Sequence, residues 1–478
     1  MLFHTLAFAI FLGITIVLVA IVRNATGRKV ILLAASYTFY GWWSVPLLAP
    51  LLFTTLLDYF IAQAIEAEQR DARRRALLIV SLTANLALLG FFKYYDFVAN
   101  AVGAPIAGVL LPIGISFYTF HTMSYTIDVY RREIPACKSP LDFALFIAFF
   151  PVLVAGPILR AKQFLPQLQR RVELQFSPSI LFLFLRGLAK KVLVADNLAT
   201  LVDTVFAKPH LWPSAVIWIA TIAFAIQIYC DFSGYSDMAR ALARLFGFDI
   251  PLNFDHPYAA KNPREFWRRW HISLSTWLRD YLYIPLGGNR HLRVRNLMIT
   301  MILGGLWHGA SWNFVLWGAM HGVLLTLSTI RHPEPRRRRR ISTDANSSHL
   351  EILRRASPTQ DDGWRSDSLA LLQRILFYYC LLLTWIAFRV HDFKMMFVAM
   401  KKFVLFDFDF SLAHRGLTGL FFITSIALIA LFFAMPRNLD ERLSRAPLAI
   451  QAAACAVIGA AFVLFWPNTS APFIYFQF

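Results

Sequence analysis

Histidine side chains occur at three points of apolar sequence where a polar ring is unusual. His308 and His321 fall within the run Leu297–Leu327, and His271 falls within the aromatic run FWRRWHISLSTWLRDYLY. An ionisable side chain inside a membrane-spanning segment is by default a functional candidate. A desolvated imidazole stays neutral and can accept a proton, so His308 is suited to act as a base. The alternative is a structural histidine that donates to a neighbouring carbonyl.

The aromatic run around His271 predicts an amphipathic helix that lies in the membrane interface. Its apolar side chains recur at i, i+3 and i+4, and its arginines fall outside that stripe. His271 lies on the apolar face, where a polar ring needs a partner or a function. The apolar face comprises Trp267, Trp270, His271, Leu274, Trp277, Leu278 and Tyr281, and the arginines are Arg268, Arg269 and Arg279.

The run Leu297–Leu327 is long and apolar enough to cross a bilayer as one helix. Its glycines would allow neighbouring helices to approach closely. In a continuous helix, His308 and His321 lie roughly 20 Å apart along the axis and cannot serve one reacting atom. Such a helix would place Ser311 and Trp312 on the same face as His308.

The composition predicts an all-α, polytopic integral membrane protein. Hydrophobic residues make up 58% of the 478 residues, and the mean hydropathy is +0.53. Soluble domains contain about 45–50% apolar residues. We expect a single transmembrane domain over residues 1–478, with roughly ten to twelve spans. Short, re-entrant and interfacial helices would surround a central tunnel.

The net charge and the cysteines exclude several classes of protein. The formal charge of +19 is expected in cytoplasmic loops and against anionic lipid, and no nucleic-acid motif accompanies it. We therefore expect contact with membrane lipid and no nucleic-acid partner. The four cysteines lie far apart without a CxxC pair, which predicts neither a zinc site nor a disulfide framework. No metal and no bound cofactor is expected.

Basic residues also predict the orientation in the membrane. The loops around Arg28, Arg73, Arg338 and Arg442 should face the cytoplasm, with both termini outside. The apolar N-terminal run lacks the features of a cleaved signal peptide and is expected to be the first span. The basic, polar stretch 331–368 is expected to be a disordered cytoplasmic loop.

Polar residues mark three segments that do not face lipid. Leu111–Tyr130 is expected to be a buried or cavity-lining helix, and Phe143–Leu159, which prolines interrupt, a re-entrant segment. Within Trp212–Phe248, Asp231 either pairs with an arginine or lines a substrate tunnel. Further apolar segments are Val30–Ile65, Ala76–Phe92, Leu369–Val390, Gly416–Met435 and Leu448–Phe465.

Several of these stretches also carry a family resemblance. They are LPIGISFYTFHTMSYTIDVYR, FFPVLVAGPILR, QIYCDFSGYSDMARALARLFGF, the run around FWRRWH, GGLWHGASWNFVLWGAMHG and the closing FIYFQF, in this order from about residue 111. The chain resembles the membrane-bound O-acyltransferase (MBOAT) family, in the bacterial branch of polysaccharide O-acetylation proteins of the alginate type. D-alanine export proteins of the lipoteichoic acid pathway are similar through the FWRRWH region. The polar stretch 331–368 departs from both.

The resemblance implies a site and a reaction. It implies that His308, in the WHG motif, is the essential histidine and that His271, in RRWH, is the second of the pair. It further implies acetyl transfer from a cytoplasmic thioester, expected to be acetyl-CoA, across the bacterial inner membrane. A separate extracytoplasmic SGNH-type transferase would then acetylate an exported polysaccharide. Candidate substrate-binding residues are Trp267, Arg268, Arg269, Trp270, Asp231, Ser311 and Trp312.

Other functions remain open at this point. Arg268 and Arg269 would meet either the phosphates of a donor or lipid headgroups. The acyl group could be D-alanyl or another group destined for a cell-envelope polymer. A non-catalytic scaffold for an extracytoplasmic acetyltransferase would tolerate the loss of His308. A secondary transporter would depend on a coupling ion, but no internal repeat is evident in the sequence.

Overall fold

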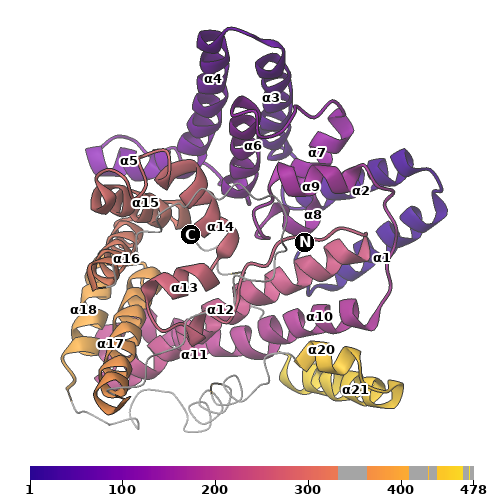
Figure 1. Ribbon diagram of the computed structural model, residues 1–478. Helices are drawn as coiled ribbons and strands as arrows, with labels where there is room; N and C mark the ends of the chain where they lie inside the picture. Colours follow the sequence, from indigo (N-terminus) through magenta and orange to yellow (C-terminus); the bar gives the residue numbers. More distant parts are fainter. Residues whose placement is uncertain (332–362, 408–428, 430–438, 467–472, 474–478) are drawn as a thin grey trace.

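A computed structural model describes residues 1–331, 363–407, 429, 439–466 and 473. The secondary structure in these ranges is helical throughout, without a strand. The prediction of an all-α polytopic protein is confirmed. Figure 1 shows α3, α4 and α6 projecting together at the top, and α12 crossing the middle of the molecule. The first helices are α1 (Leu6–Ile21), α2 (Ala25–Gly41), α3 (Leu48–Ala67), α4 (Asp71–Leu89), α5 (Tyr95–Val102) and α6 (Ile115–Tyr130).

A buried carboxylate joins the three projecting helices. Asp58 of α3 is fully buried. It accepts hydrogen bonds from Ser81 and Asn85 of α4 and from Thr126 of α6, at 2.7 Å from the Asn85 amide and 3.2 Å from the Thr126 hydroxyl. Since a buried polar group must be hydrogen-bonded, this network fixes how α3, α4 and α6 face one another.

The interrupted segment after α6 lies inside the protein. Every residue from 145 to 153 is buried, and the re-entrant course of this segment stays a prediction. Side chains accept hydrogen bonds from three of its backbone amides, as buried irregular chain requires. The amide of Phe150 donates to Ser36, that of Ile158 to Ser273 and that of Leu159 to the Nε2 atom of His121. The helices here are α7 (Pro140–Ala148), α8 (Phe150–Leu153) and α9 (Ala161–Leu168).

The long helix α12 (Ser214–Leu245) forms the centre of the core. It packs against α10 (Pro178–Ala189), the π-helical turn Lys190–Ala195 and α11 (Asp196–Ala207). A Cβ atom on Gly187 would lie 2.5 Å from the carbonyl oxygen of Gly234, so only glycine permits this approach of α10 to α12.

The aromatic run around His271 does not form the single interfacial helix that its periodicity predicts. It forms α13 (Pro263–Arg269) and α14 (Ile272–Leu278), separated at His271, whose φ of 42° is left-handed. Residues from an earlier segment impose the break. The amide of Asp255 donates to Arg269, and the amide of Ile272 donates to Asn253, both at 2.9 Å. His271 is fully buried within the protein.

The predicted continuous helix through both later histidines is also wrong. The run forms α15 (Arg293–His308) and α16 (Trp312–Arg331), with extended backbone at Gly309. The two helices pack antiparallel and in close contact at two glycines. A Cβ atom on Gly305 would lie 2.1 Å from the carbonyl oxygen of Phe314, and one on Gly318 would lie 2.4 Å from that of Met301. His308 and His321 are therefore brought toward each other.

The remaining helices complete the described part of the chain. The predicted loop lies outside it over 332–362, and α17 begins at Gly363, ahead of the expected boundary. The apolar segment Gly416–Met435 lies outside it, apart from residue 429. These helices are α17 (Gly363–Arg389), α18 (Phe393–Val404), α20 (Leu439–Ser444) and α21 (Leu448–Phe465).

Within the described ranges, five helical stretches are long and apolar enough to cross a membrane. This supports the prediction of a multi-pass membrane protein. Several other apolar segments are divided into shorter helices, as at α7–α8 and α13–α14. The central tunnel stays a prediction. The five stretches are Leu48–Ala67, Asp71–Val102, Ser214–Leu245, Ser368–Arg389 and Leu448–Phe465.

Candidate functional site

His308 is the last residue of α15 and is 3% exposed. The carbonyls at a helix C-terminus have no partner within the helix. Here Tyr94 donates from its hydroxyl to the carbonyl of Leu306 at 2.8 Å. The Nζ atom of Lys93 lies 2.5 Å from the carbonyl oxygen of Trp307 and 3.3 Å from that of His308. These bonds satisfy the last carbonyls of the helix and so fix the backbone that carries His308.

Lys93 and Tyr94 belong to the π-helical turn Gly90–Tyr94 between α4 and α5. Single π-turns inside α-helices occur frequently at functional sites. The turn adds a residue to the helical repeat and so changes the direction of the side chains that follow it. We did not identify Lys93 from the sequence, although a lysine in the apolar run FFKYY is itself a signal for function.

His271 is fully buried, and its orientation is fixed by Asn253. The Nδ1 atom lies 3.2 Å from the Oδ1 atom of Asn253. The backbone amide and the hydroxyl of Ser273 donate to the same Asn253 atom, at 3.2 Å and 2.9 Å, which identifies it as the oxygen. Because that oxygen can only accept, Nδ1 of His271 carries the proton and Nε2 is the nitrogen able to accept one.

The structure brings the two predicted catalytic histidines together. The ring centroids of His271 and His308 are 6.3 Å apart, with 62° between the ring planes. The indole of Trp307 contacts both rings, with its centroid 5.7 Å from His271 and 5.0 Å from His308. Two elements that are distant in sequence, α15 and the break between α13 and α14, thus supply one buried site.

His321 belongs to the edge of this site. Trp317 lies next to both later histidines, with its ring centroid 5.1 Å from that of His308 and 4.6 Å from that of His321. The antiparallel packing of α15 and α16 produces this arrangement. The separation of roughly 20 Å that a single helix would impose is therefore wrong.

Aromatic side chains from two other helices complete the surroundings of the histidines. Phe388 of α17 lies 5.2 Å from His308, and Phe232 of α12 lies 4.6 Å from His271, measured between ring centroids. Neither residue was itself predicted as a site residue, although Phe232 directly follows the predicted Asp231. Their contribution is to exclude water, which strengthens electrostatic interactions at the site.

The predicted substrate-binding residues divide into two groups. Trp267 lies 5.1 Å from His321 and 5.8 Å from Trp317, so it lies beside the histidines. Trp270 is buried and packs 5.0 Å from Trp385. Arg268 is exposed. Arg269 forms ion pairs with Glu265 at 2.9 Å and Asp255 at 3.7 Å.

The other three predicted binding residues have other contacts. Asp231 forms a salt bridge with Lys191 at 2.8 Å, and Lys191 also binds Asp196 at 2.8 Å. The expected partner was an arginine, but a lysine from the neighbouring π-helical turn takes that place. Ser311 lies in the turn between α15 and α16. Trp312 is 57% exposed and contacts Phe97.

The site can move a proton and exclude water. It offers two buried imidazoles and an aromatic enclosure, with Lys93 and Tyr94 hydrogen-bonded to the backbone beside one imidazole. Within the described part of the chain, no group of three or more His, Cys, Asp or Glu side chains is arranged to bind a metal ion.

Comparison with known proteins identifies the family. The family model of the membrane-bound O-acyltransferase family, MBOAT, matches residues 129–333, which include His271 and His308. The chain belongs to this family.

Three relatives indicate its branch. The chain is 44% identical over 316 residues to the probable alginate O-acetylase AlgI of Azotobacter vinelandii, covering 63% of each protein. It is 38% identical over 354 residues to a peptidoglycan O-acetyltransferase of Helicobacter pylori, covering 66% of this chain and 67% of that protein. It is 29% identical over 235 residues to a teichoic acid D-alanyltransferase of Streptococcus thermophilus, covering 45% and 56%. The chain thus spans 63% of the length of the Azotobacter relative that it matches.

Proposed function

We propose that this protein is an O-acyltransferase that takes acetyl groups from a cytoplasmic thioester, acetyl-CoA, for the O-acetylation of an exported polysaccharide. The observation that carries the proposal is the convergence of His308 and His271, with ring centroids 6.3 Å apart in a buried aromatic site. The names of two relatives, an alginate O-acetylase and a peptidoglycan O-acetyltransferase, support acetyl as the acyl group and a cell-envelope polymer as its destination. The protein would act in the bacterial inner membrane.

His308 serves as the general base. Its basic ring nitrogen takes the proton of the acceptor hydroxyl while the hydroxyl oxygen attacks the thioester carbonyl carbon. The carbonyl electrons move onto oxygen and return as the C–S bond breaks. The departing thiolate takes the proton from the imidazolium, leaving an ester, a free thiol and neutral His308. A base of this kind contributes about 10²–10⁴-fold in rate.

His271 serves as a positioning group. Its Nδ1 proton is donated to Asn253, so neutral His271 has no second N–H with which to stabilise an oxyanion. Its Nε2 atom can accept a hydrogen bond from the acceptor hydroxyl or from the imidazole of His308. The geometry therefore favours orientation of a reacting partner over donation to the oxyanion.

Lys93 and Tyr94 position His308 through its backbone. They bind the last three carbonyls of α15. Small displacements of a catalytic group cost large factors in rate, because the reacting atoms must lie within about 3–3.5 Å. Neither side chain needs to touch the substrate to have a large effect.

The acetyl group would then pass to a separate extracytoplasmic SGNH-type transferase, which acetylates the polymer. A tunnel across the membrane would let the cytoplasmic donor and the extracytoplasmic acceptor meet at His308. A second candidate is D-alanyl transfer, which the similarity to a teichoic acid D-alanyltransferase favours.

Reconstitution of the purified protein in proteoliposomes tests the proposal. With acetyl-CoA outside and a hydroxyl acceptor inside, free thiol should be released together with acetylated acceptor in equal amounts. Transfer from a D-alanyl thioester without transfer from acetyl-CoA would select the second candidate. Transport of an ion without thiol release from either donor would contradict both.

A further inference from the structure

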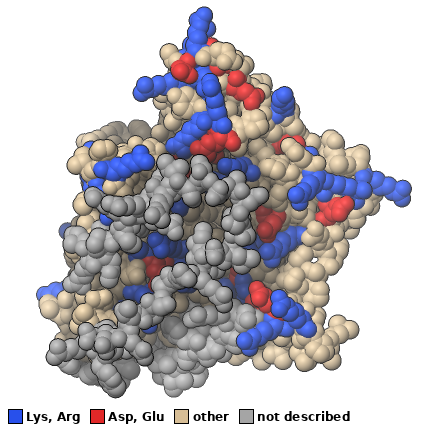
Figure 2. Space-filling model, viewed as in Figure 1, with Lys and Arg blue, Asp and Glu red and all other residues tan. Residues whose placement is uncertain are grey.

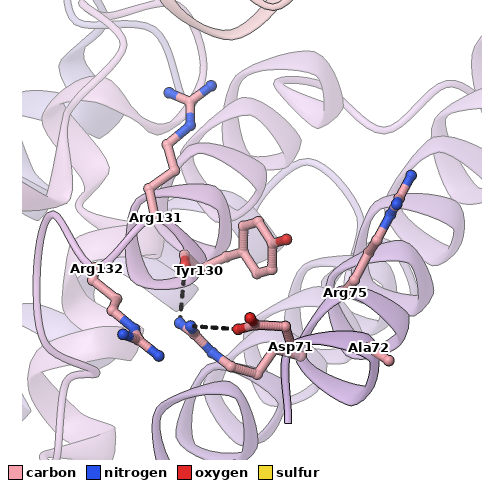
Figure 3. Close-up of a pocket in the computed structure, with 7 residues that line it drawn as sticks. Asp71, Ala72, Arg75, Tyr130, Arg131 and Arg132 are labelled. Atoms are coloured by element: carbon pink, nitrogen blue, oxygen red, sulfur yellow. Dashed lines mark hydrogen bonds and ion pairs between the residues drawn. The ribbon is translucent and has the colours of Figure 1, made fainter. Parts of the chain in front are cut away.

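An open basic pocket lies at the end of α6 that is remote from His308. It has a volume of about 540 Å³ and lies between the N-terminus of α4 and the C-terminus of α6. Arg75 and Ala72 come from one side, and Tyr130, Arg131 and Arg132 come from the other (Figure 3). The lining residues are Asp71, Ala72, Arg74, Arg75, Tyr130, Arg131 and Arg132.

The pocket is strongly positive. Four arginines line it, against one carboxylate, that of Asp71. Among the residues that the structure describes, Arg75 and Arg132 form no salt bridge. Both side chains are exposed and can turn toward a ligand. Figure 2 shows Lys and Arg side chains gathered at the top of the molecule, where Figure 1 places the outer ends of α3 and α4.

Arg74 is the buried arginine of the pocket, and hydrogen bonds hold its side chain in place. Its side chain is 7% exposed. It donates from Nε to the carbonyl of Ile65 at 3.2 Å and from one terminal nitrogen to the carbonyl of Tyr130 at 2.9 Å. Its other terminal nitrogen lies 4.0 Å from Asp71, beyond hydrogen-bonding distance. A guanidinium has five N–H donors, so this buried and immobile group keeps donors available.

The remaining groups add to the preference for an anion. The α4 helix begins without a side-chain cap, so its first amides are available to a ligand. Arg132 has a φ of 59°, a strained conformation for a residue with a side chain, at the point where α6 ends. Asp71 is 93% exposed at its side chain and can move away from the pocket.

We propose that this pocket binds a phosphate group. The planar guanidinium group of arginine matches the geometry of phosphate oxygens. Two or three guanidinium groups around one phosphate form charge-assisted, bidentate hydrogen bonds with it. The phosphate belongs either to a lipid headgroup or to a soluble phosphorylated compound, since both present the same oxygens. The positive-inside rule places the pocket on the cytoplasmic side. The proposal does not depend on acyl transfer.

The test compares two variants of the full-length protein that lose the same charge. One carries Arg75→Gln and Arg132→Gln, which remove two exposed lining arginines. The control carries Arg70→Gln and Arg73→Gln, which lie on the same loop and helix turn outside the pocket. Wild type and both variants are purified in phosphatidylcholine nanodiscs. Inorganic pyrophosphate is titrated at constant ionic strength, with calorimetry and thermal unfolding as readouts.

A second arm replaces part of the phosphatidylcholine with phosphatidylglycerol and measures the change in Tm. If a soluble phosphate is the ligand, pyrophosphate binds wild type and control, and binds the Arg75/Arg132 variant at least about tenfold more weakly. If the headgroup is the ligand, only phosphatidylglycerol stabilises the protein, and that stabilisation is lost in the Arg75/Arg132 variant alone. Equal responses of all three proteins, or no response in either arm, would overturn the proposal.

Discussion

Lys93 donates a hydrogen bond to the carbonyl of Trp307 across 214 positions of sequence. This bond and its companion to His308 join the π-helical turn after α4 to the last turn of α15. They place the catalytic candidate by its main chain, while the imidazole itself remains directed into the aromatic site. The relationship makes Lys93 a positioning residue and leads to the first prediction.

Replacing Lys93 with Met should lower kcat about 10- to 100-fold with little change in KM, because the imidazole moves while the substrate contacts remain. Lys93→Arg retains donors for both carbonyls and should recover part of the loss. The measurement is the steady-state rate of thiol release by reconstituted protein. The matched control is Lys162→Met, an exposed lysine on α9. An equal loss in the Met and Arg variants would contradict a role in positioning.

Asn253→Ala should reduce activity by about tenfold or more, because His271 loses the acceptor that fixes its tautomer. Asn253→Asp keeps an oxygen at the same place and should retain more activity than Asn253→Ala. The initial rate of acetyl transfer is measured for each, and thermal unfolding separates a folding defect from a catalytic one. The hypothesis fails if the two variants are equally active.

His321→Phe should keep most of the wild-type activity. His321 contacts the rings of Trp317 and Trp267, so an aromatic ring of similar size preserves this packing. The equivalent change His308→Phe should leave no measurable transfer, since the packing is kept and the base is lost. A comparable loss in both variants would indicate that His321 takes part in the chemistry.

Gly305→Ala should separate α15 from α16 and abolish most activity. The added Cβ would lie 2.1 Å from a backbone oxygen of Phe314, which cannot move as the end of a side chain can. Overpacking of this kind costs about 1–3 kcal/mol. Gly13→Ala is the matched control, because no atom lies within 4 Å of its new methyl group. Thermal unfolding and transfer activity are measured for both, and equal behaviour would contradict the packing argument.

The sequence was informative where the signal is local. Apolar runs predicted a helical membrane protein, and the motifs around His271 and His308 identified the pair of rings that the structure brings together. Interrupting prolines predicted the buried segment after α6. Each of these features depends on residues close together in the chain.

The failures have a common physical cause. The periodicity around His271 is that of a continuous helix, but main-chain bonds from Asn253 and Asp255 impose a left-handed residue at the break. Similarly, Gly309 adopts an extended conformation because α15 and α16 pack antiparallel through their glycines. Contacts between segments that are distant in sequence decide both features. A short stretch of sequence does not show such contacts. Lys93 is a different case. Its position in an apolar run is visible in the sequence, so no long-range contact was needed to single it out.

The most direct measurement is acetyl transfer by His308→Ala. The variant should insert at wild-type levels, because His308 contributes its ring to an aromatic enclosure that other side chains still form. Acetyl content of the exported polymer and thiol release from acetyl-CoA by the purified protein are measured together, with membrane levels checked by blot. We expect both to fall to background. Wild-type acetylation by the His308→Ala protein would contradict the catalytic account and favour a scaffold for another transferase.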